Sequence, residues 1–380
     1  MTTNPSSPDK YAYWLALSRA PRLGNARLRA LLSKLPDPQS VFEADSAQLT
    51  ALGLSQETRE YLNAPDWSVI EKDLAWLRQP DHHLLTLGDD DYPPRLLEIP
   101  DPPPLLFARG NPRVLTYPQI AIVGSRNPTP TGQETAFALA NELVGMGFVI
   151  TSGLATGIDG AAHRGAIAGG GQTVAVVGTG LDRVYPARHR DLGLDVVKNG
   201  VCISEFPLGS PPLAAHFPLR NRIISGLGLG VLVVEATTRS GSLITARLAA
   251  EQGREVFAIP GSIHNPLSRG CHMLLRQGAK LVESAEDILE EIGPQDIGIF
   301  PDEAGITKPD TDSDRDFQPD PEYKLLLDNL GFEPTLIDVL VERTGLTVEV
   351  ISSMLLTLEL GGHVASAPGG RYLRVGERKT

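Results

Sequence analysis

The sequence predicts an α/β protein built around a Rossmann-like parallel sheet. Short apolar or β-branched runs alternate with helical stretches, and these runs are QIAIVGSR, FVITSGLA, TVAVVGTG, VCISEF, VLVVEA and EVFAIPG. Such strands are typical of a sheet that is buried on both faces. We therefore expect helices on each side of a parallel sheet and ligand-binding loops at the carboxyl ends of its strands.

A chain of 380 residues is too long for one ordinary core, so we expect two or three domains. We predict an N-terminal helical domain of the helix-hairpin-helix or SAM-like type over residues 1–80 and an extended connection over 81–116. The Rossmann-like domain covers 117–292, an acidic flexible linker covers 293–320, and a winged-helix domain covers 321–380.

The first segment contains two short helix-turn-helix patterns, 20–35 around Gly24 and 49–62 around Gly53. The turn amides of such pairs can approach a phosphate backbone. Short patterns of this kind are common, however, so a small helical packing domain is the favoured interpretation. Residues 92–110 are rich in proline and turns, which indicates an extended connection into the sheet.

The last segment reads as three helices followed by a two-stranded wing that turns at Gly369 and Gly370. The expected recognition helix, 347–360, carries two glutamates and no Lys or Arg. DNA binding depends strongly on cationic contacts to phosphate, so this helix has poor electrostatic support for entering a DNA groove. Partner binding or self-association by this domain stays open.

The charge of the chain argues at first sight against nucleic acid, because the net formal charge is −12. The acidic excess is uneven. Residues 293–320 hold eight acids and two bases, whereas 117–292 hold fifteen acids and fourteen bases. A local basic groove in the sheet domain is therefore compatible with the composition.

No secretory signal or membrane-spanning apolar run is recognisable in the sequence. Cys202 and Cys271 have neither disulfide-framework nor metal-ligand spacing. We therefore expect a cytoplasmic protein without a metal site.

The first candidate binding turn is Gly124-Ser125-Arg126, directly after a predicted strand. A glycine turn that opens into a helix exposes backbone N–H groups to a phosphate, and arginine adds charged donors. The alternative is a plain turn with a surface arginine. The string GSRNPTPTG is not G-x-G-x-x-G, and no P-loop is present, so neither a dehydrogenase nor an ATPase is indicated.

The second turn begins with Ser152-Gly153, where small residues let phosphates approach the backbone. Asp159 and His163 follow and are four residues apart, so they share a helix face. Their structural alternative is a capping aspartate and a histidine tethered in solvent. No third group completes a metal site or a catalytic triad.

The third candidate, 217–222, places Phe217, Arg220, Asn221 and Arg222 close together. Bases stack on aromatic rings while arginines hold phosphates, as single-stranded nucleic acid requires. The alternative, which these residues alone somewhat favour, is a core phenylalanine with arginines paired to acids such as Glu205 or Glu235.

The fourth candidate, 235–243, combines Glu235 and Arg239 with a hydroxyl-rich helix start at Ser240-Gly241. A helix N-terminus suits an anion, although plain capping by Ser240 or Ser242 explains the same residues. Because a parallel sheet gathers its strand-end loops at one edge, the four candidates together are more informative than any one.

These ordered motifs resemble the DNA-processing protein A (DprA/Smf) family. The resemblance is carried by VGSR, SGLATGIDGAAH, TVAVVGTGLDRVYP, ISEFP, FPLRNRIISGLG, VLVVEATTRSGSLITARLAAEQGREVFAIPG and RGCHMLLRQGA, with YPPRLLEIPDPPPLLFARG upstream. His189 and His272 stand where many relatives have asparagine, outside the candidate arginine pocket.

The resemblance implies a non-catalytic protein that binds single-stranded DNA during natural transformation, protects it and helps load RecA recombinase onto strands covered by single-strand-binding protein. It also implies a homodimer formed through the Rossmann-like domain, and no cofactor. The expected DNA-binding residues are Gly124, Ser125, Arg126, Ser152, Gly153, Phe217, Arg220, Asn221, Arg222, Arg239, Ser240 and Gly241.

Two rival interpretations remain. The first is a nucleotide-binding sensor or a phosphoribohydrolase-like enzyme on a related fold, with Glu235 and Arg239 as its candidate pair. Its expected P-G-G-x-G-T-x-x-E motif is missing from the sequence. The second is a transcriptional regulator that uses the winged domain, and the absence of bases in 347–360 counts against it.

Overall fold

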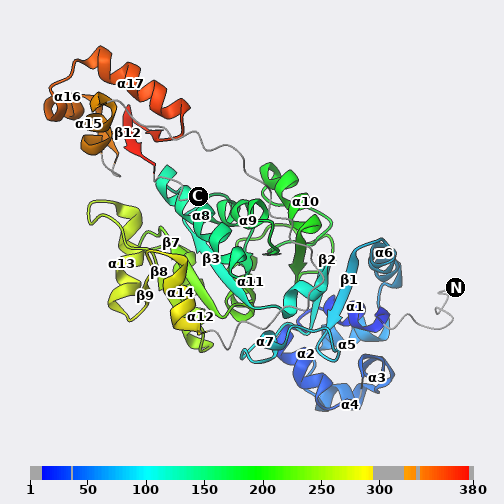
Figure 1. The fold of residues 1–380 in the computed structure, drawn as a ribbon. Helices are drawn as coiled ribbons and strands as arrows, with labels where there is room; N and C mark the ends of the chain where they lie inside the picture. The colour runs from blue at the N-terminus through cyan, green and yellow to red at the C-terminus, as the bar shows by residue number, and fades with distance from the viewer. Residues whose placement is uncertain (1–10, 36, 294–320, 331–333, 376–380) are drawn as a thin grey trace.

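The computed structural model describes residues 11–35, 37–293, 321–330 and 334–375. Six short helices open the described chain, a mixed sheet with helices on both faces follows, and a small winged unit closes it (Figure 1). Gly293 aside, the predicted acidic linker lies outside the described residues. Among those residues, no helix is both long and apolar enough to cross a bilayer.

The central sheet confirms the predicted fold class. Its strand order is β1-β2-β6-β5-β4-β3-β7-β8-β9 within the described chain. The strands from β3 to β9 pair in parallel, and they are β3 (Gln119–Gly124), β4 (Val149–Ser152), β5 (Thr173–Val176), β6 (Gly200–Ser204), β7 (Gly230–Val234), β8 (Glu255–Ala258) and β9 (Lys280–Leu281).

Both faces of the sheet from β3 to β8 are buried because alternate residues of these strands enter different cores. Ile120 and Ile122 of β3 pack on one side, while Ala121 and Val123 pack on the other. The helices between and after these strands are α8 (Pro130–Gly145), α9 (Ile158–Ala168), α10 (Arg190–Lys198), α11 (His216–Leu227), α12 (Ser242–Glu251), α13 (Arg269–Arg276) and α14 (Ala285–Ile292).

The strand order reverses between β3 and β7. From β3 the chain builds outward through β4, β5 and β6, and it then returns to place β7 on the other side of β3. The crevice at the carboxyl ends of the strands beside such a reversal is the usual ligand site of an open α/β sheet. The turns after β3, β4 and β7 meet there.

Residues 81–116 correct a sequence prediction, because they are not an extended connection. They form β1 (His82–Thr86), α7 (Pro94–Leu97), β2 (Leu105–Gly110) and a short 3₁₀ helix (Pro112–Thr116). Strand β2 pairs antiparallel with both β1 and β6 and so extends the sheet. Leu106 and Phe107 of β2 are fully buried. The segment is therefore not a connection, because its prolines flank two strands that belong to the core.

The N-terminal region packs its own small core. Its helices are α1 (Ala12–Ser18), α2 (Asn25–Leu32), α3 (Pro38–Glu43), α4 (Ser46–Ala51), α5 (Gln56–Asn63) and α6 (Trp67–Leu77). Side chains of Asp37, Asp45 and Ser55 cap the starts of α3, α4 and α5, as favoured N-cap residues do. Gly53 adopts φ +79° between α4 and α5, a conformation natural to glycine.

The C-terminal region is a winged helix unit, as predicted. Its elements are α15 (Pro321–Leu330), β10 (Thr335–Leu336), α16 (Ile337–Thr344), α17 (Val348–Leu360), β11 (Val364–Ala367) and β12 (Arg371–Arg374). The wing joins β11 to β12 through Gly369 and Gly370, both at positive φ. On α17, the predicted recognition helix, Leu356 and Leu360 are exposed.

Candidate nucleic-acid interface

A groove of about 580 Å³ lies at the carboxyl ends of β3 and β7 and against the starts of α11 and α12. This volume is within the range of ordinary ligand sites. Residues from all four predicted turns line it, and those among the predicted site residues are Gly124, Ser125, Arg126, Phe217, Arg220, Asn221, Ser240 and Gly241. The sheet therefore brings together segments more than a hundred residues apart in sequence.

Arg126 forms the exposed cationic side of this groove. Its guanidinium carbon lies 5.5 Å from the centre of the Phe217 ring. The preceding turn is fixed by its own backbone, because the Ser125 carbonyl accepts a hydrogen bond of 3.1 Å from the Ile158 amide at the start of α9. Gly124 is required for packing, since a Cβ there would lie 1.9 Å from the Val234 carbonyl oxygen.

Arg220 supplies a second cation, and this one is buried with only 5% of its surface exposed. Within the described chain its Nε has no hydrogen-bond partner. Its guanidinium lies directly on Gly153, where a Cβ would come within 1.7 Å of Nη1. The absence of a side chain at Gly153 therefore leaves the space that the Arg220 guanidinium occupies.

Asp159 is the acidic group nearest to Arg220 in this site. Its carboxylate accepts hydrogen bonds from the backbone amides of Gly153 at 3.1 Å and Ala155 at 3.3 Å. Burial raises the pKa of Asp159, against the pull of Arg220. Burial lowers the pKa of Arg220 to about 10, a shift that Asp159 opposes. Arg220 therefore stays charged at neutral pH beside a carboxylate already engaged by backbone amides.

Two neighbouring aromatic rings lie at this site: Phe217 lines the groove, and Tyr185 lines the cavity next to it. Phe217 is partly buried, and its ring centre lies 5.9 Å from that of Tyr185, which is 45% exposed. A smaller cavity of about 280 Å³ continues past Phe217 and is lined by Tyr185, Arg188, Arg126 and Arg220. Arginines beside exposed aromatic faces are the combination that single-stranded nucleic acid uses.

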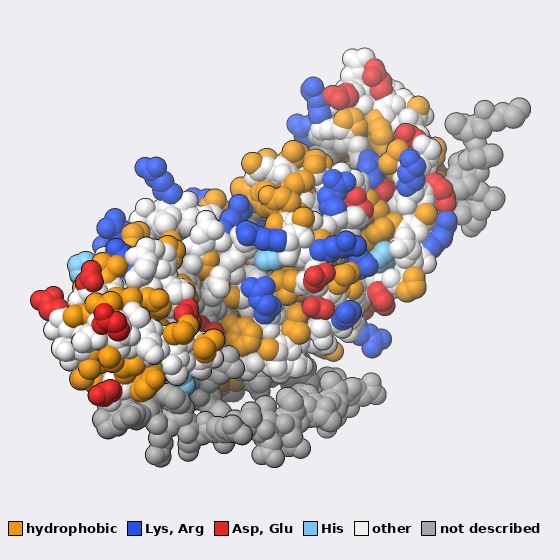
Figure 2. Space-filling view, turned by 90° about the horizontal axis from the view of Figure 1, so that it is seen from above, with side chains coloured by type: hydrophobic (Ala, Val, Ile, Leu, Met, Phe, Trp, Pro, Cys, Tyr) orange, Lys and Arg blue, Asp and Glu red, His pale blue; other side chains and the backbone are white. Residues whose placement is uncertain are grey.

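Sequence reasoning missed Tyr185 and Arg188. The stretch 183–190, RVYPARHR, does place an aromatic residue among basic ones, and that signal would have found them. Lys and Arg side chains also lie across the middle of the face shown in Figure 2, with hydrophobic and some acidic side chains among them. The overall negative charge of the chain thus does not prevent basic side chains from gathering locally.

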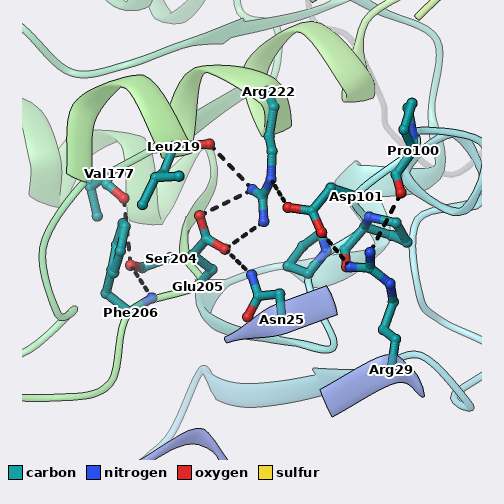
Figure 3. A network of polar contacts seen from close by, with 12 residues as sticks. Asn25, Arg29, Pro100, Asp101, Val177, Ser204, Glu205, Phe206, Leu219 and Arg222 are labelled. Carbon is teal, nitrogen blue, oxygen red and sulfur yellow. Dashed lines mark hydrogen bonds and ion pairs between the residues drawn. The ribbon is translucent and has the colours of Figure 1, made fainter. Parts of the chain in front are cut away.

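Arg222 corrects the predicted site, because it is not among the residues that line the groove and its guanidinium points instead towards Glu205 and Asp101 (Figure 3). Its guanidinium donates to both Glu205 oxygens, at 3.0 and 2.6 Å, and to Asp101 at 3.1 Å. The side chain is only 9% exposed. With its donors committed to carboxylates, Arg222 is not a phosphate contact, and the alternative of pairing with Glu205 holds.

Two further predicted residues are also placed differently. The Ser152 side chain is buried and donates to the Ile122 carbonyl at 2.6 Å, so Ser152 contributes to the turn through its backbone and not through its hydroxyl. Arg239 lines a separate cavity beside Leu243 and Arg247 rather than the groove.

Glu235 and Arg239, the candidate pair of the enzymatic alternative, line two different cavities. The Glu235 carboxylate accepts hydrogen bonds from the Thr129 amide at 2.8 Å and from the Thr129 hydroxyl at 2.5 Å. Because Thr129 caps the start of α8, Glu235 has a structural role: it fixes the capping residue.

His163 is fully buried, so the alternative of a histidine tethered in solvent is wrong. Its Nδ1 is hydrogen-bonded to the Thr173 hydroxyl at 2.7 Å, and burial lowers the pKa of His163 to about 3. Among the described residues, no group of three or more His, Cys, Asp or Glu side chains is arranged to hold a metal ion.

Comparison with known proteins identifies two matching families. The model of the DNA recombination-mediator protein A family matches residues 83–293, and that of the DprA winged helix domain matches residues 309–370. Protein Smf of Escherichia coli K12 is 46% identical over 89% of this chain and 88% of its own length. DNA processing protein DprA of Streptococcus pneumoniae R6 is 51% identical over 53% of this chain and 72% of its own.

Solved structures agree with these matches. The crystal structure of DNA processing protein A from Streptococcus pneumoniae superimposes with a TM-score of 0.64 at 39% identity, covering 74% of this chain and 97% of that one. A structure reported for the single-stranded DNA binding mode of DNA processing protein A from Helicobacter pylori has a TM-score of 0.50 at 30% identity. It covers 55% of this chain and 95% of the other.

Proposed function

The chain belongs to the DNA recombination-mediator protein A family, and from this premise we propose that it binds single-stranded DNA in the groove between Arg126, Phe217 and Arg220. The observation that carries the proposal is the buried Arg220 guanidinium, which lies on Gly153, lines the groove together with Phe217, and has a donor, Nε, without a hydrogen-bond partner among the described residues. A cation that lines a groove attracts an anion there, and charge-assisted hydrogen bonds to phosphate are the strong ones.

The groove suits an unpaired strand. Phosphates lie against Arg126, Arg220 and the amides at the start of α12, where Ser240 and Gly241 stand. Bases stack on Phe217 and Tyr185, which requires base faces that a duplex keeps buried in its own stack. Positive charge and stacking without base-edge readout predict binding that is strong but tolerant of sequence.

The biological role that we propose follows the family. The protein protects incoming single strands in the cytoplasm during natural transformation and helps load RecA recombinase onto strands covered by single-strand-binding protein. It acts as a homodimer and without catalysis. Its relatives in Streptococcus pneumoniae and Bacillus subtilis carry the name DNA processing protein DprA, and the structural relative from Helicobacter pylori is described with single-stranded DNA.

Fluorescence anisotropy with a labelled oligonucleotide, as a single strand and as a duplex, tests the proposal. Wild-type protein is expected to prefer the single strand, and Arg126→Ala to weaken binding. Equal affinity for both forms, or wild-type affinity in Arg126→Ala, contradicts the site. Incubation with nucleoside monophosphates tests the enzymatic alternative: release of base that Glu235→Ala abolishes would replace the binding proposal.

A further inference from the structure

Helix α11, which carries Phe217 and Arg220, is held from its other side by the N-terminal helices (Figure 3). Helix α2 places Asn25 and Arg29 one turn apart. The Asn25 amide donates to a Glu205 oxygen at 2.7 Å, and the Arg29 guanidinium donates to an Asp101 oxygen at 2.6 Å. These two carboxylates are the ones that bind Arg222, so a continuous polar network runs from α2 to α11.

Arg222 controls the orientation of α11. Residues 220 and 222 are about 200° apart around a helix, so their side chains leave on opposite sides. Phe217 and Arg220 are three residues apart and share a face, which is the face that lines the groove. Fixing the far side through Arg222 therefore fixes the rotation of the helix and the position of both groove residues.

A second contact holds the segment that leads into α11. Arg19 follows α1, pairs with buried Asp73 at 2.7 Å and donates to the Leu208 carbonyl at 3.0 Å. In the same segment the Phe206 ring stacks on His216, the first residue of α11, with ring centres 4.0 Å apart. The N-terminal helices thus restrain α11 and its approach together.

The pair between Arg222 and Glu205 is largely dry, with side chains 9% and 7% exposed, whereas Asp101 is 43% exposed. A desolvated ion pair is favourable only with good geometry and with its remaining lone pairs satisfied. Asn25 and Arg29 satisfy lone pairs on the two carboxylates. Without them the carboxylates are less restrained, and the orientation of Arg222 is less sharply determined.

We propose that Asn25 and Arg29 are positioning residues for the DNA groove, which set its affinity from outside by fixing the rotation of α11. This inference rests on the proposed binding of single-stranded DNA. Neither residue contacts the strand, so each acts on how often the groove adopts its binding geometry. The apparent dissociation constant rises as the fraction of molecules with that geometry falls.

The test is the affinity of full-length Arg29→Ala and Asn25→Ala for a labelled single-stranded oligonucleotide, titrated at several salt concentrations. We expect Arg29→Ala to bind roughly five- to tenfold more weakly, at the low end for coupled sites, with the salt slope unchanged because no phosphate contact is lost. Arg27→Ala is the matched control. Arg27 lies on the same helix, is exposed, and within the described chain donates to the Arg22 carbonyl alone, so this variant is expected to bind like wild type.

Hydrogen exchange provides a readout that a general loss of stability does not give. In Arg29→Ala we expect faster exchange of the α11 amides and unchanged exchange in α8. Wild-type affinity in Arg29→Ala overturns the inference but leaves the proposed function intact, whereas a wild-type protein that does not bind single strands removes the proposed function itself. A salt slope reduced by about 0.7 would mean that Arg29 touches phosphate, which also overturns the inference.

Asn25→Ala keeps the test decisive if Arg29→Ala does not fold. It removes one hydrogen bond and no charge. Weaker binding by folded Asn25→Ala, with the α11 amides exchanging faster, supports the positioning role. Wild-type affinity in that variant overturns it.

Discussion

Replacing Gly153 by alanine is expected to disable the groove without removing any charge. A Cβ at this position would lie 1.7 Å from Arg220 Nη1 and 2.5 Å from Cζ. Real Cβ contacts of this kind are not found below 3.0 Å, so the guanidinium must move by more than an ångström. It is the end of a flexible side chain, and Gly153 is not among the glycines at positive φ, so the backbone accepts alanine.

The size of the effect follows from the bonds that such a shift breaks. A hydrogen bond to a charged group contributes about 1.5–3 kcal/mol, and a displacement of this size takes a phosphate out of hydrogen-bonding range. Affinity for single-stranded DNA is therefore expected to fall roughly 10- to 150-fold. Stability should change far less, since the fold keeps its contacts.

The assay is an anisotropy titration beside a thermal melt of the same preparation. Gly145→Ala is the matched control, because nothing lies within 4 Å of the Cβ that it would add and it sits at the far end of α8. If Gly153→Ala binds like wild type, Arg220 does not hold the strand. If affinity falls only in step with the melting temperature, the effect is on folding and the reasoning is refuted.

Three further predictions follow from the same geometry. Phe217→Ala should weaken binding by about 1–3 kcal/mol through the loss of a stacked base while leaving the salt slope unchanged; a changed slope in the titrations would count against stacking. Arg222→Ala leaves the buried Glu205 carboxylate without its cationic partner, although the Asn25 amide still donates to it, and should cost about 3–5 kcal/mol of unfolding free energy, measured by chemical denaturation; unchanged stability together with a salt slope reduced by about 0.7 would return Arg222 to the DNA site. Burial lowers the pKa of His163 from 6.5 to about 3. Between these two pH values this histidine is protonated in the unfolded chain and neutral in the folded chain. Stability should therefore decline as pH falls from about 6.5 towards 3, and His163→Asn should lose this part of the decline in melts run across that range.

Much of the site was visible in the sequence because strand-end loops of a parallel sheet share one edge. The strands were recognisable as apolar runs, and this alone predicted that the turns at Gly124, Gly153 and Gly241 would meet near residues 217–222. The strands β1 and β2 were missed because the prolines around them masked two short apolar runs. A proline-rich stretch looks like a connection unless its strands are seen paired with β6.

Local patterns and one rule of sheet topology were enough to predict the α/β class, the winged domain and the candidate turns. Which arginine faces the groove could be established only from the folded arrangement. Arg220 and Arg222 are equivalent in composition, and their roles separate because a helix turns about 200° between them. One then lies on Gly153, while the other meets Glu205 and Asp101. Those partners come from segments remote in sequence, and a distance in space cannot be read from local patterns.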